Sequence, residues 1–125
     1  CDNEKDADEL ADLVVRGTKR ATASLKLSYE AEGEALPSVG DLSMITRWNG
    51  EPVAIIETTR VDIVPFREVS AEFAATEGED DGSLEYWRRG HRRFFSQECR
   101  DAGTEFSENM DVVCERFEAI YGSPE

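Results

Sequence analysis

The stretch GTKRATASL, residues 17–25, joins an acidic helical pattern to an alternating pattern that is typical of a strand. Glycine just past a helical pattern is a common stop signal, because it takes the left-handed conformation without steric cost. We therefore expect a helix to end at Gly17. In the strand, Thr22 and Ser24 share one face and apolar side chains occupy the other. The pattern predicts an amine, on Lys19, and a hydroxyl, on Thr22, together at the entrance to the first strand.

The length and charge of the chain limit what it can be. A chain of 125 residues indicates a single domain, spanning 1–125, with room for one compact core. Its 14 Lys and Arg against 28 Asp and Glu give a net charge of −14. Proteins that bind nucleic acid draw much of their affinity from neutralising phosphates with Lys and Arg. A small neutral ligand therefore suits this chain better than a polyanion, unless the few basic residues cluster.

Three cysteines, Cys1, Cys99 and Cys114, show no CxxC spacing and are odd in number. This argues against a disulfide framework and a structural zinc site, and it favours the cytoplasm. We expect no metal and no cofactor. No apolar run approaches the roughly 20 residues of a membrane span, and no signal peptide is visible. Because the chain opens without methionine, we expect a short segment to precede it.

Apolar periodicity and capping signals predict an alternation of helices and strands. We expect helices over 5–16, 69–75 (capped by Ser70) and 84–102 (capped by Ser83), and strands over 21–29, 42–47, 52–64 and 110–121. Asn49-Gly50 is a strong hairpin signal between the second and third strands. This order predicts a small α+β domain, with a curled mixed β-barrel flanked by about three helices.

Glu57 is conspicuous in the third strand. The alternating pattern places it on one face with Val53, Ile55 and Val61, the more apolar register. A carboxylate that faces a core costs several kcal/mol unless it is paired or neutralised. We therefore expect this face to open on a cleft, or a cation to lie opposite, and Lys19 is the predicted partner.

Five motifs in order carry a resemblance to a known family. They are Gly17-x-Lys19-x-x-Thr22, LPSVGD at 36–41, IIETT at 55–59, EGEDDGSLEYW at 77–87 and VCERF at 113–117. With these motifs the chain resembles the ASCH family, in particular its compact bacterial branch, whose members have a PUA-like fold. It departs from the family at the front, where such proteins usually carry a further stretch before the first helix.

The resemblance implies a ligand cleft beside the barrel, near the Gly-x-Lys-x-x-Thr turn. The wider family is linked to RNA, and some compact members resemble amidohydrolases that remove an acyl group from a modified cytidine. Their lysine, threonine and glutamate would fall on Lys19, Thr22 and Glu57. The first hypothesis is thus a hydrolase that cleaves a linear amide on a nucleoside-like ligand. The alternatives are an RNA-binding module or weak ribonuclease, and an interaction domain without chemistry.

Hydrolysis of an N-acyl amide needs a nucleophile, a base and a stabiliser for the oxyanion. Thr22 supplies the hydroxyl in this hypothesis, with Ser24 as a second hydroxyl, and Lys19 acts as base when its amine is neutral. Glu57 orients Lys19 or carries a proton to the leaving nitrogen, although an ionised Glu57 also favours the charged amine. Backbone amides of residues 17–22 are expected to bind the oxyanion. Each residue also has a structural explanation: Lys19 offsets a helix end, Thr22 favours a strand, and Glu57 lies exposed at the barrel mouth.

Substrate contacts are expected from a second group of side chains: Arg20, Ser24, Tyr86, Trp87 and His91. His91 lies on the apolar stripe of the long helix, so a core histidine is the alternative to a ligand contact. Tyr86 and Trp87 either pack in the core or form a stacking shelf for a base. Glu77, Glu79 and Asp80 are interpreted as a solvated loop and helix entry.

Four of the 14 basic residues form the one basic cluster of the sequence: Arg88, Arg89, Arg92 and Arg93. In a chain of charge −14 they are expected to pair with nearby acids. They are also where RNA phosphates would bind, if the chain has an RNA partner. The sequence does not indicate an oligomeric state.

Overall fold

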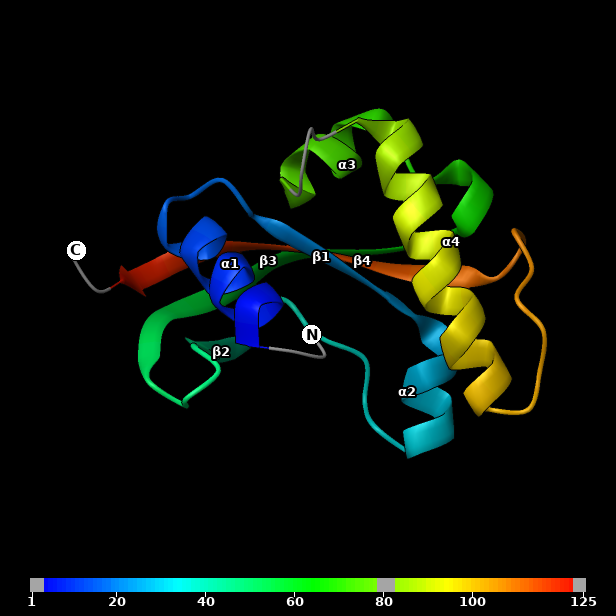
Figure 1. Ribbon diagram of the computed structural model, residues 1–125, viewed down its shortest axis with the longest axis horizontal. Helices are drawn as coiled ribbons and strands as arrows, with labels where there is room; N and C mark the ends of the chain where they lie inside the picture. The colour runs from blue at the N-terminus through cyan, green and yellow to red at the C-terminus, as the bar shows by residue number, and fades with distance from the viewer. Residues whose placement is uncertain (1–3, 79–82, 123–125) are drawn as a thin grey trace.

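The computed structural model describes residues 4–78 and 83–122, which form one sheet with helices around it (Figure 1). In chain order the elements are α1 (Glu4–Val15), β1 (Ala21–Leu25), α2 (Lys26–Glu32), β2 (Leu42–Thr46), β3 (Pro52–Pro65), the 3-10 helix η1 (Phe66–Glu68), α3 (Ala71–Glu77), α4 (Leu84–Asp101) and β4 (Asp111–Gly122). The predicted α+β class is confirmed.

The four strands pair antiparallel in the order β1-β4-β3-β2. The long strand β3 bends as it crosses the molecule and gives the sheet its curl (Figure 1). Irregular pairing of β3 with β4, between Ile55 and Ile56 and between Thr58 and Arg60, accompanies this bend, and bulges of this kind increase local twist. The sheet is therefore a curled half-barrel in which all pairing is antiparallel, and the described residues form four α-helices, where about three were expected.

Local signals at the helix ends and at the hairpin are confirmed. Gly17 follows α1 with a φ of 77°, in the left-handed region that favours glycine. The hydroxyls of Ser70 and Ser83 accept hydrogen bonds from the backbone N–H groups of Phe73 and Tyr86 at the starts of α3 and α4. Gly50, between β2 and β3, also has a positive φ, of 90°. These ends form as predicted because each depends on residues close in sequence.

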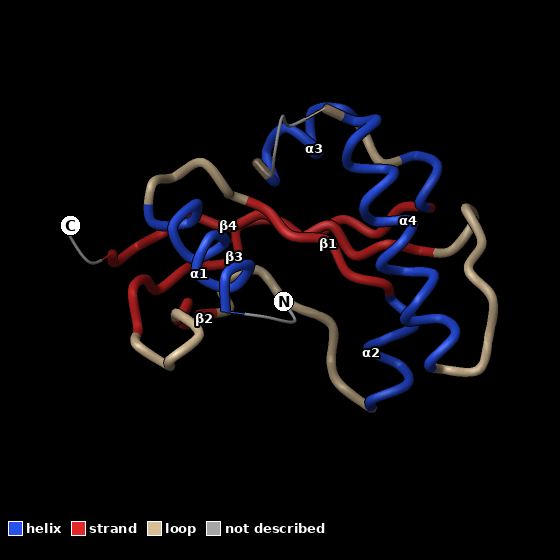
Figure 2. Tube along the Cα trace, viewed as in Figure 1, coloured by secondary structure: helices blue, strands red, loops and turns tan. Residues whose placement is uncertain are grey.

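The predicted strand over 21–29 is wrong beyond Leu25, where the chain turns directly into α2 (Figure 2). Lys26 and Glu30 form an i,i+4 ion pair with 3.8 Å between their charged atoms, a pairing that stabilises helices. Leu27 packs against the larger core, and Gly33 ends the helix in the left-handed conformation. The sequence of residues 26–29 is compatible with either a strand or a short helix, and the packing of Leu27 against the core favours the helix.

The face predicted for Glu57 is also wrong. Around Glu57 the buried side chains are Ala54, Ile56 and Thr58, and in the Glu57 register only Val53, near the start of β3, is buried. Glu57 is half-buried on the opposite face, paired across strands with Leu42. Because β3 carries apolar residues on both faces, its sequence alone did not show which face is buried in the core. Since β4 separates β3 from β1, Glu57 lies two strand spacings, about 10 Å, from β1.

Two hydrophobic clusters pack on opposite faces of the sheet. The larger cluster joins β1, η1, α3 and α4 around Phe66, Trp87 and Phe95, and the smaller joins α1 to β3 and β4 through Val14 and Phe117. In β4 the even-numbered Val112 and Cys114 belong to the larger cluster and the odd-numbered Phe117 to the smaller. Because successive strand residues face opposite sides, α1 and α4 cover different faces, with the edge strand β1 between them.

Candidate functional site

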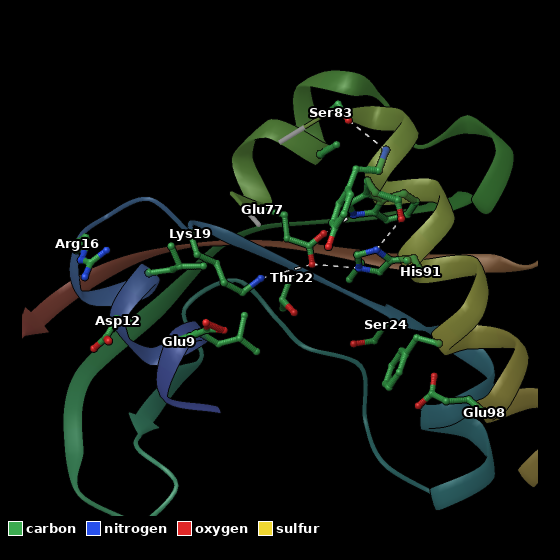
Figure 3. Close-up of a pocket in the computed structure, with 18 residues that line it drawn as sticks. Glu9, Asp12, Arg16, Lys19, Thr22, Ser24, Glu77, Ser83, His91 and Glu98 are labelled. Carbon is green, nitrogen blue, oxygen red and sulfur yellow. Dashed lines mark hydrogen bonds and ion pairs between the residues drawn. The ribbon is translucent and has the colours of Figure 1, made fainter. Parts of the chain in front are cut away.

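A cleft of about 1130 Å³ runs along the edge of β1, between α1 and α4. Three consecutive strand residues, Thr22, Ala23 and Ser24, line it. Because their side chains alternate between faces, the cleft follows the strand edge rather than either face. Figure 3 shows the polar side chains that converge here, from the turn before β1, from the end of α3 and from α4.

Lys19 is buried at the inner end of the cleft. Its backbone N–H donates to the Leu13 carbonyl, which fixes it to the end of α1. Its Nζ donates to the Ala21 carbonyl at 2.8 Å and lies 3.5 Å from Oε2 of Glu77. In Figure 3 the ends of Lys19 and Glu77 meet, with Thr22 beside them. The predicted amine and hydroxyl therefore share one site, and the carboxylate that joins them is Glu77.

Glu77 is only 2% exposed and is surrounded by donors. Its Oε1 accepts a hydrogen bond from Nε1 of Trp87, and its Oε2 lies 3.4 Å from Nε2 of His91 as well as near Lys19. Burial by itself raises the pKa of the Glu77 carboxyl. The contacts with His91, Lys19 and Trp87 outweigh burial and hold this pKa below its ordinary value of 4.5. The site therefore holds a buried carboxylate in its ionised form.

Gly78 packs the end of α3 tightly against the turn that carries Lys19. It has a φ of 71°, and a Cβ built on it would lie 2.1 Å from the Thr18 carbonyl oxygen. Next to it, the Arg20 N–H donates to the Thr76 carbonyl at 2.9 Å. These two contacts set the separation between Lys19 and Glu77.

The arrangement can be compared with known proteins. A family model described as "ASCH domain" matches residues 1–121. The chain belongs to the ASCH family. No curated protein matches it.

Two solved structures are similar to this ASCH domain. The crystal structure of an ASCH domain from Lactobacillus crispatus JV V101 shares 47% identity with a TM-score of 0.92, and the match covers 97% of this chain and 76% of that chain. A protein from Enterococcus faecalis V583 shares 40% identity with a TM-score of 0.81, over 90% of this chain and 67% of that chain. The PUA-like fold inferred from the five motifs is confirmed.

The cleft brings together most of the residues predicted for the site. Those that line it are Lys19, Thr22, Ser24, Tyr86, Trp87 and His91. Arg20 is exposed and Glu57 lies on β3, and neither lines the cleft. What each cleft residue does remains a prediction.

The oxyanion contacts expected from the turn are not available at its first four amides. The N–H groups of Gly17, Thr18 and Lys19 donate to carbonyls at the end of α1, and that of Arg20 donates to Thr76. The turn is thus stabilised by its own backbone hydrogen bonds, which consume these donors.

Glu77 is the residue that the sequence reasoning missed, because we interpreted it as part of a solvated loop. Glu79 and Asp80 of that interpretation lie outside the described residues. One signal was present: Glu77 is the last residue of a short helix before a left-handed glycine, Gly78, within a motif that the ASCH resemblance includes. Phe94 was also missed: it lines the cleft and is 51% exposed.

Two members of the arginine cluster make contacts within the ASCH domain. Arg92 pairs with Glu108 and lies over the Phe66 ring, and Arg88 donates to the Arg67 carbonyl at 3.2 Å. Arg92 therefore pairs with an acid, as predicted from the net charge, whereas the contact of Arg88 is with a backbone carbonyl.

Other features of residues 4–78 and 83–122 bear on the remaining expectations. In these ranges no helix has the length and apolar character needed to cross a membrane. The same ranges contain no cluster of three or more His, Cys, Asp or Glu placed to hold a metal ion. Cys99 and Cys114 are both buried free thiols.

The lowered pKa of Glu77 predicts a specific dependence of stability on pH. A carboxyl whose pKa is lower in the folded state contributes stability above the unfolded value, and this is lost as the pH falls through the folded value. Unfolding by denaturant at about pH 7 and about pH 4 is expected to show a smaller loss of stability on acidification for Glu77→Gln than for wild type.

Glu98 is a control in which the pKa of the carboxyl shifts in the opposite direction. Burial raises this pKa, the nearby charges of Glu32 and Asp101 raise it further, and a hydrogen bond from Ser28 lowers it. Its ionised form is thus less stable in the fold, so Glu98→Gln is expected to gain stability at neutral pH and to lose that gain in acid. Equal pH dependence for wild type and Glu77→Gln would contradict the buried ionised carboxylate.

Proposed function

We propose that this ASCH domain is an amidohydrolase that removes an acyl group from an acylated nucleoside bound along the edge of β1. The observation that carries the proposal is the buried Lys19–Glu77 pair, which opens on a cleft beside the Thr22 hydroxyl. Burying two opposite charges is costly and often adds no net stability. A chemical role accounts for a buried pair with one end accessible from a cleft.

Thr22 is the proposed nucleophile and Lys19 its base. The Thr22 oxygen attacks the acyl carbon while its proton passes to the neutral Lys19 amine. The amide C–N bond then breaks, and the leaving nitrogen takes a proton from the Lys19–Glu77 pair. Water cleaves the resulting threonine ester, which releases the carboxylic acid and restores the Thr22 hydroxyl. Glu77 orients Lys19 and stabilises it whenever it carries the proton.

The free edge of β1 offers a donor for the oxyanion. The Phe117 N–H on β4 donates to the Arg20 carbonyl. Because the hydrogen-bonding direction of the backbone alternates along an antiparallel strand, the N–H and C=O groups of residues 22 and 24 point toward β4, and those of residues 21 and 23 point away from it. The Ala21 carbonyl, which points away from β4, already accepts a hydrogen bond from Lys19 Nζ. The N–H of Ala23, which lines the cleft, therefore points toward the ligand and replaces the turn amides in the proposed role.

The outer part of the cleft suits a flat, largely neutral ligand. Tyr86, Gly90 and Phe94 lie at i, i+4 and i+8 on α4 and all line the cleft, and the two aromatic residues are 41% and 51% exposed. A Cβ built on Gly90 meets nothing within 4 Å. The missing side chain leaves a gap in the aromatic stripe, over which a nucleobase is expected to stack.

Gly90→Ala is expected to change stability and ligand binding in opposite directions. Gly90 lies in the interior of α4, so alanine is expected to stabilise the protein by about 1 kcal/mol through helix propensity. The added methyl group narrows the gap and is expected to raise KM or the Kd for cytidine several-fold. Thermal unfolding and calorimetric titration measure the two effects. Arg89→Ala, at an exposed neighbour outside the cleft, is the control for binding, and unchanged cytidine affinity in Gly90→Ala would remove this residue from the ligand site.

The central test uses N-acetylated cytidine, with release of cytidine followed by chromatography. Wild type is expected to deacylate it, and Thr22→Val and Lys19→Ala are expected to be inactive, while Thr22→Ser keeps the hydroxyl and part of the rate. Arg20→Ala, exposed and outside the cleft, is expected to behave as wild type. Full activity in Thr22→Val would exclude the proposed nucleophile, and an inactive wild type would count against the function.

RNA binding is the second candidate, in line with the general association of ASCH domains with RNA and nucleosides. One observation favours it: Arg89 and Arg93 are exposed on α4, each next to a residue that lines the cleft, Gly90 and Phe94. The net charge of −14 opposes it. Salt-sensitive binding or cleavage of single-stranded RNA, lost in an Arg89→Ala/Arg93→Ala variant, without deacylation would favour this candidate.

A further inference from the structure

His91 is the single histidine of the chain, and it links Glu77 to the backbone of α4. Its Nδ1 lies 2.9 Å from the Trp87 carbonyl oxygen, and its Nε2 lies 3.4 Å from Oε2 of Glu77. The ring stacks on Trp87, with centroids 4.2 Å apart and planes 16° apart, and the Phe95 ring packs against it. The imidazole is thereby held with one nitrogen facing the buried carboxylate.

These contacts restrict where the protons of the ring lie. A carbonyl oxygen only accepts hydrogen bonds, so Nδ1 must carry a hydrogen to bond the Trp87 carbonyl. A neutral imidazole has one N–H, and its Nε2 would then direct a lone pair at Oε2 of Glu77. Two lone pairs that face each other in a buried site repel. A proton on Nε2 converts the contact into a charge-assisted hydrogen bond.

We propose that His91 is a positioning residue that acts through Glu77: it stands as an imidazolium in the resting site, and its Nε2–H holds the carboxylate toward the cleft. The consequence for catalysis rests on the proposed amidohydrolase function. With His91 charged, Glu77 remains neutralised when Lys19 gives up its proton. This removes the difficulty that an ionised carboxylate beside Lys19 favours the charged amine.

The surrounding charges agree with this assignment. From α3, Glu77 remains ionised, and its other oxygen is already occupied by Trp87 Nε1. Lys19 approaches the same carboxylate from the turn before β1. Around the cleft, α1 contributes Glu9, Asp12 and Arg16, and α4 contributes Glu98. Asp12 is paired with Arg47, so the carboxylate that bears directly on His91 is Glu77, which lies 3.4 Å from its Nε2 and favours a cation there.

A single histidine makes the charge state directly measurable. In ¹⁵N-labelled wild type at about pH 7, long-range ¹H–¹⁵N spectra are expected to show both ring nitrogens protonated. In Glu77→Gln the ring is expected to be neutral, with the hydrogen on Nδ1. Glu98→Gln removes a carboxylate from the same helix and cleft, seven residues further along the chain, and it is expected to leave the ring charged. A neutral ring in wild type, or a charged ring in Glu77→Gln, would overturn the proposal.

His91→Gln tests the consequence for catalysis, because glutamine retains a donor and removes the charge. In this variant kcat/KM is expected to fall about tenfold at neutral pH and to approach the wild-type value as the pH rises, because nothing then offsets the Glu77 charge that favours the protonated amine. A purely structural role would lower the rate by one factor at all pH values, and that result would overturn the catalytic part. If wild type does not hydrolyse the substrate, the proposed function fails, while the spectra still decide the charge of His91.

Discussion

Glu77→Gln is expected to lower kcat/KM for N-acetylated cytidine by about 10³-fold, the range observed when a proton carrier or charge stabiliser is removed. Glutamine preserves the size of the side chain, and its oxygen still accepts from Trp87. It loses the charge that orients Lys19 and the means to return a proton to the leaving nitrogen. Steady-state kinetics of cytidine release measure the effect, and circular dichroism verifies the fold.

Glu57→Gln is the matched control, because the sequence pattern favours Glu57 and the structure places Glu77 at Lys19. Glu57 lies on β3 outside the cleft, so this variant is expected to remain within about twofold of wild type. The reverse outcome, a large loss in Glu57→Gln and none in Glu77→Gln, would show that the cleft geometry does not describe the active site.

Gly78→Ala is expected to destabilise the protein by about 3 kcal/mol or more. Its φ of 71° is unfavourable for alanine, and the new Cβ would lie 2.1 Å from the Thr18 carbonyl oxygen and 3.2 Å from the Cα of Lys19. Backbone must therefore move, and the end of α3 must shift away from the turn. Denaturant unfolding measures the loss, and activity is expected to fall further than stability because Lys19 and Glu77 separate.

Gly33→Ala isolates the steric part of this effect. Gly33 ends α2 with a similar φ of 67°, yet a Cβ there meets nothing within 4 Å. It is expected to cost only the left-handed strain, about 1–2 kcal/mol. Equal destabilisation in the two variants would mean that contact with Thr18 does not constrain the site.

The sequence predicted the features that depend on neighbouring residues. The stops and starts at Gly17, Ser70 and Ser83 follow from local backbone chemistry, and so does the hairpin around Gly50. The amine and hydroxyl at Lys19 and Thr22 were also predictable, because Lys19 lies in the turn before β1 and Thr22, three residues on, is the second residue of that strand.

The remaining features depend on contacts between distant segments. The buried face of β3 could not be read from its alternation, because both registers carry apolar residues and the pairing with β4 shifts near Thr58. Glu77 resembles any helix-end glutamate until α3 docks beside Lys19 and Trp87. The first strand ends early because α2 gains contacts with the core, which no window of residues 26–29 reveals.

The Lys19–Glu77 contact joins positions 58 residues apart, and this separation affects the order of events when the protein refolds. A helix can regain its shape during refolding before distant segments meet. The proposed activity therefore requires a late event, the closure of a long loop, and its recovery is expected to lag behind the far-ultraviolet signal in a refolding time course.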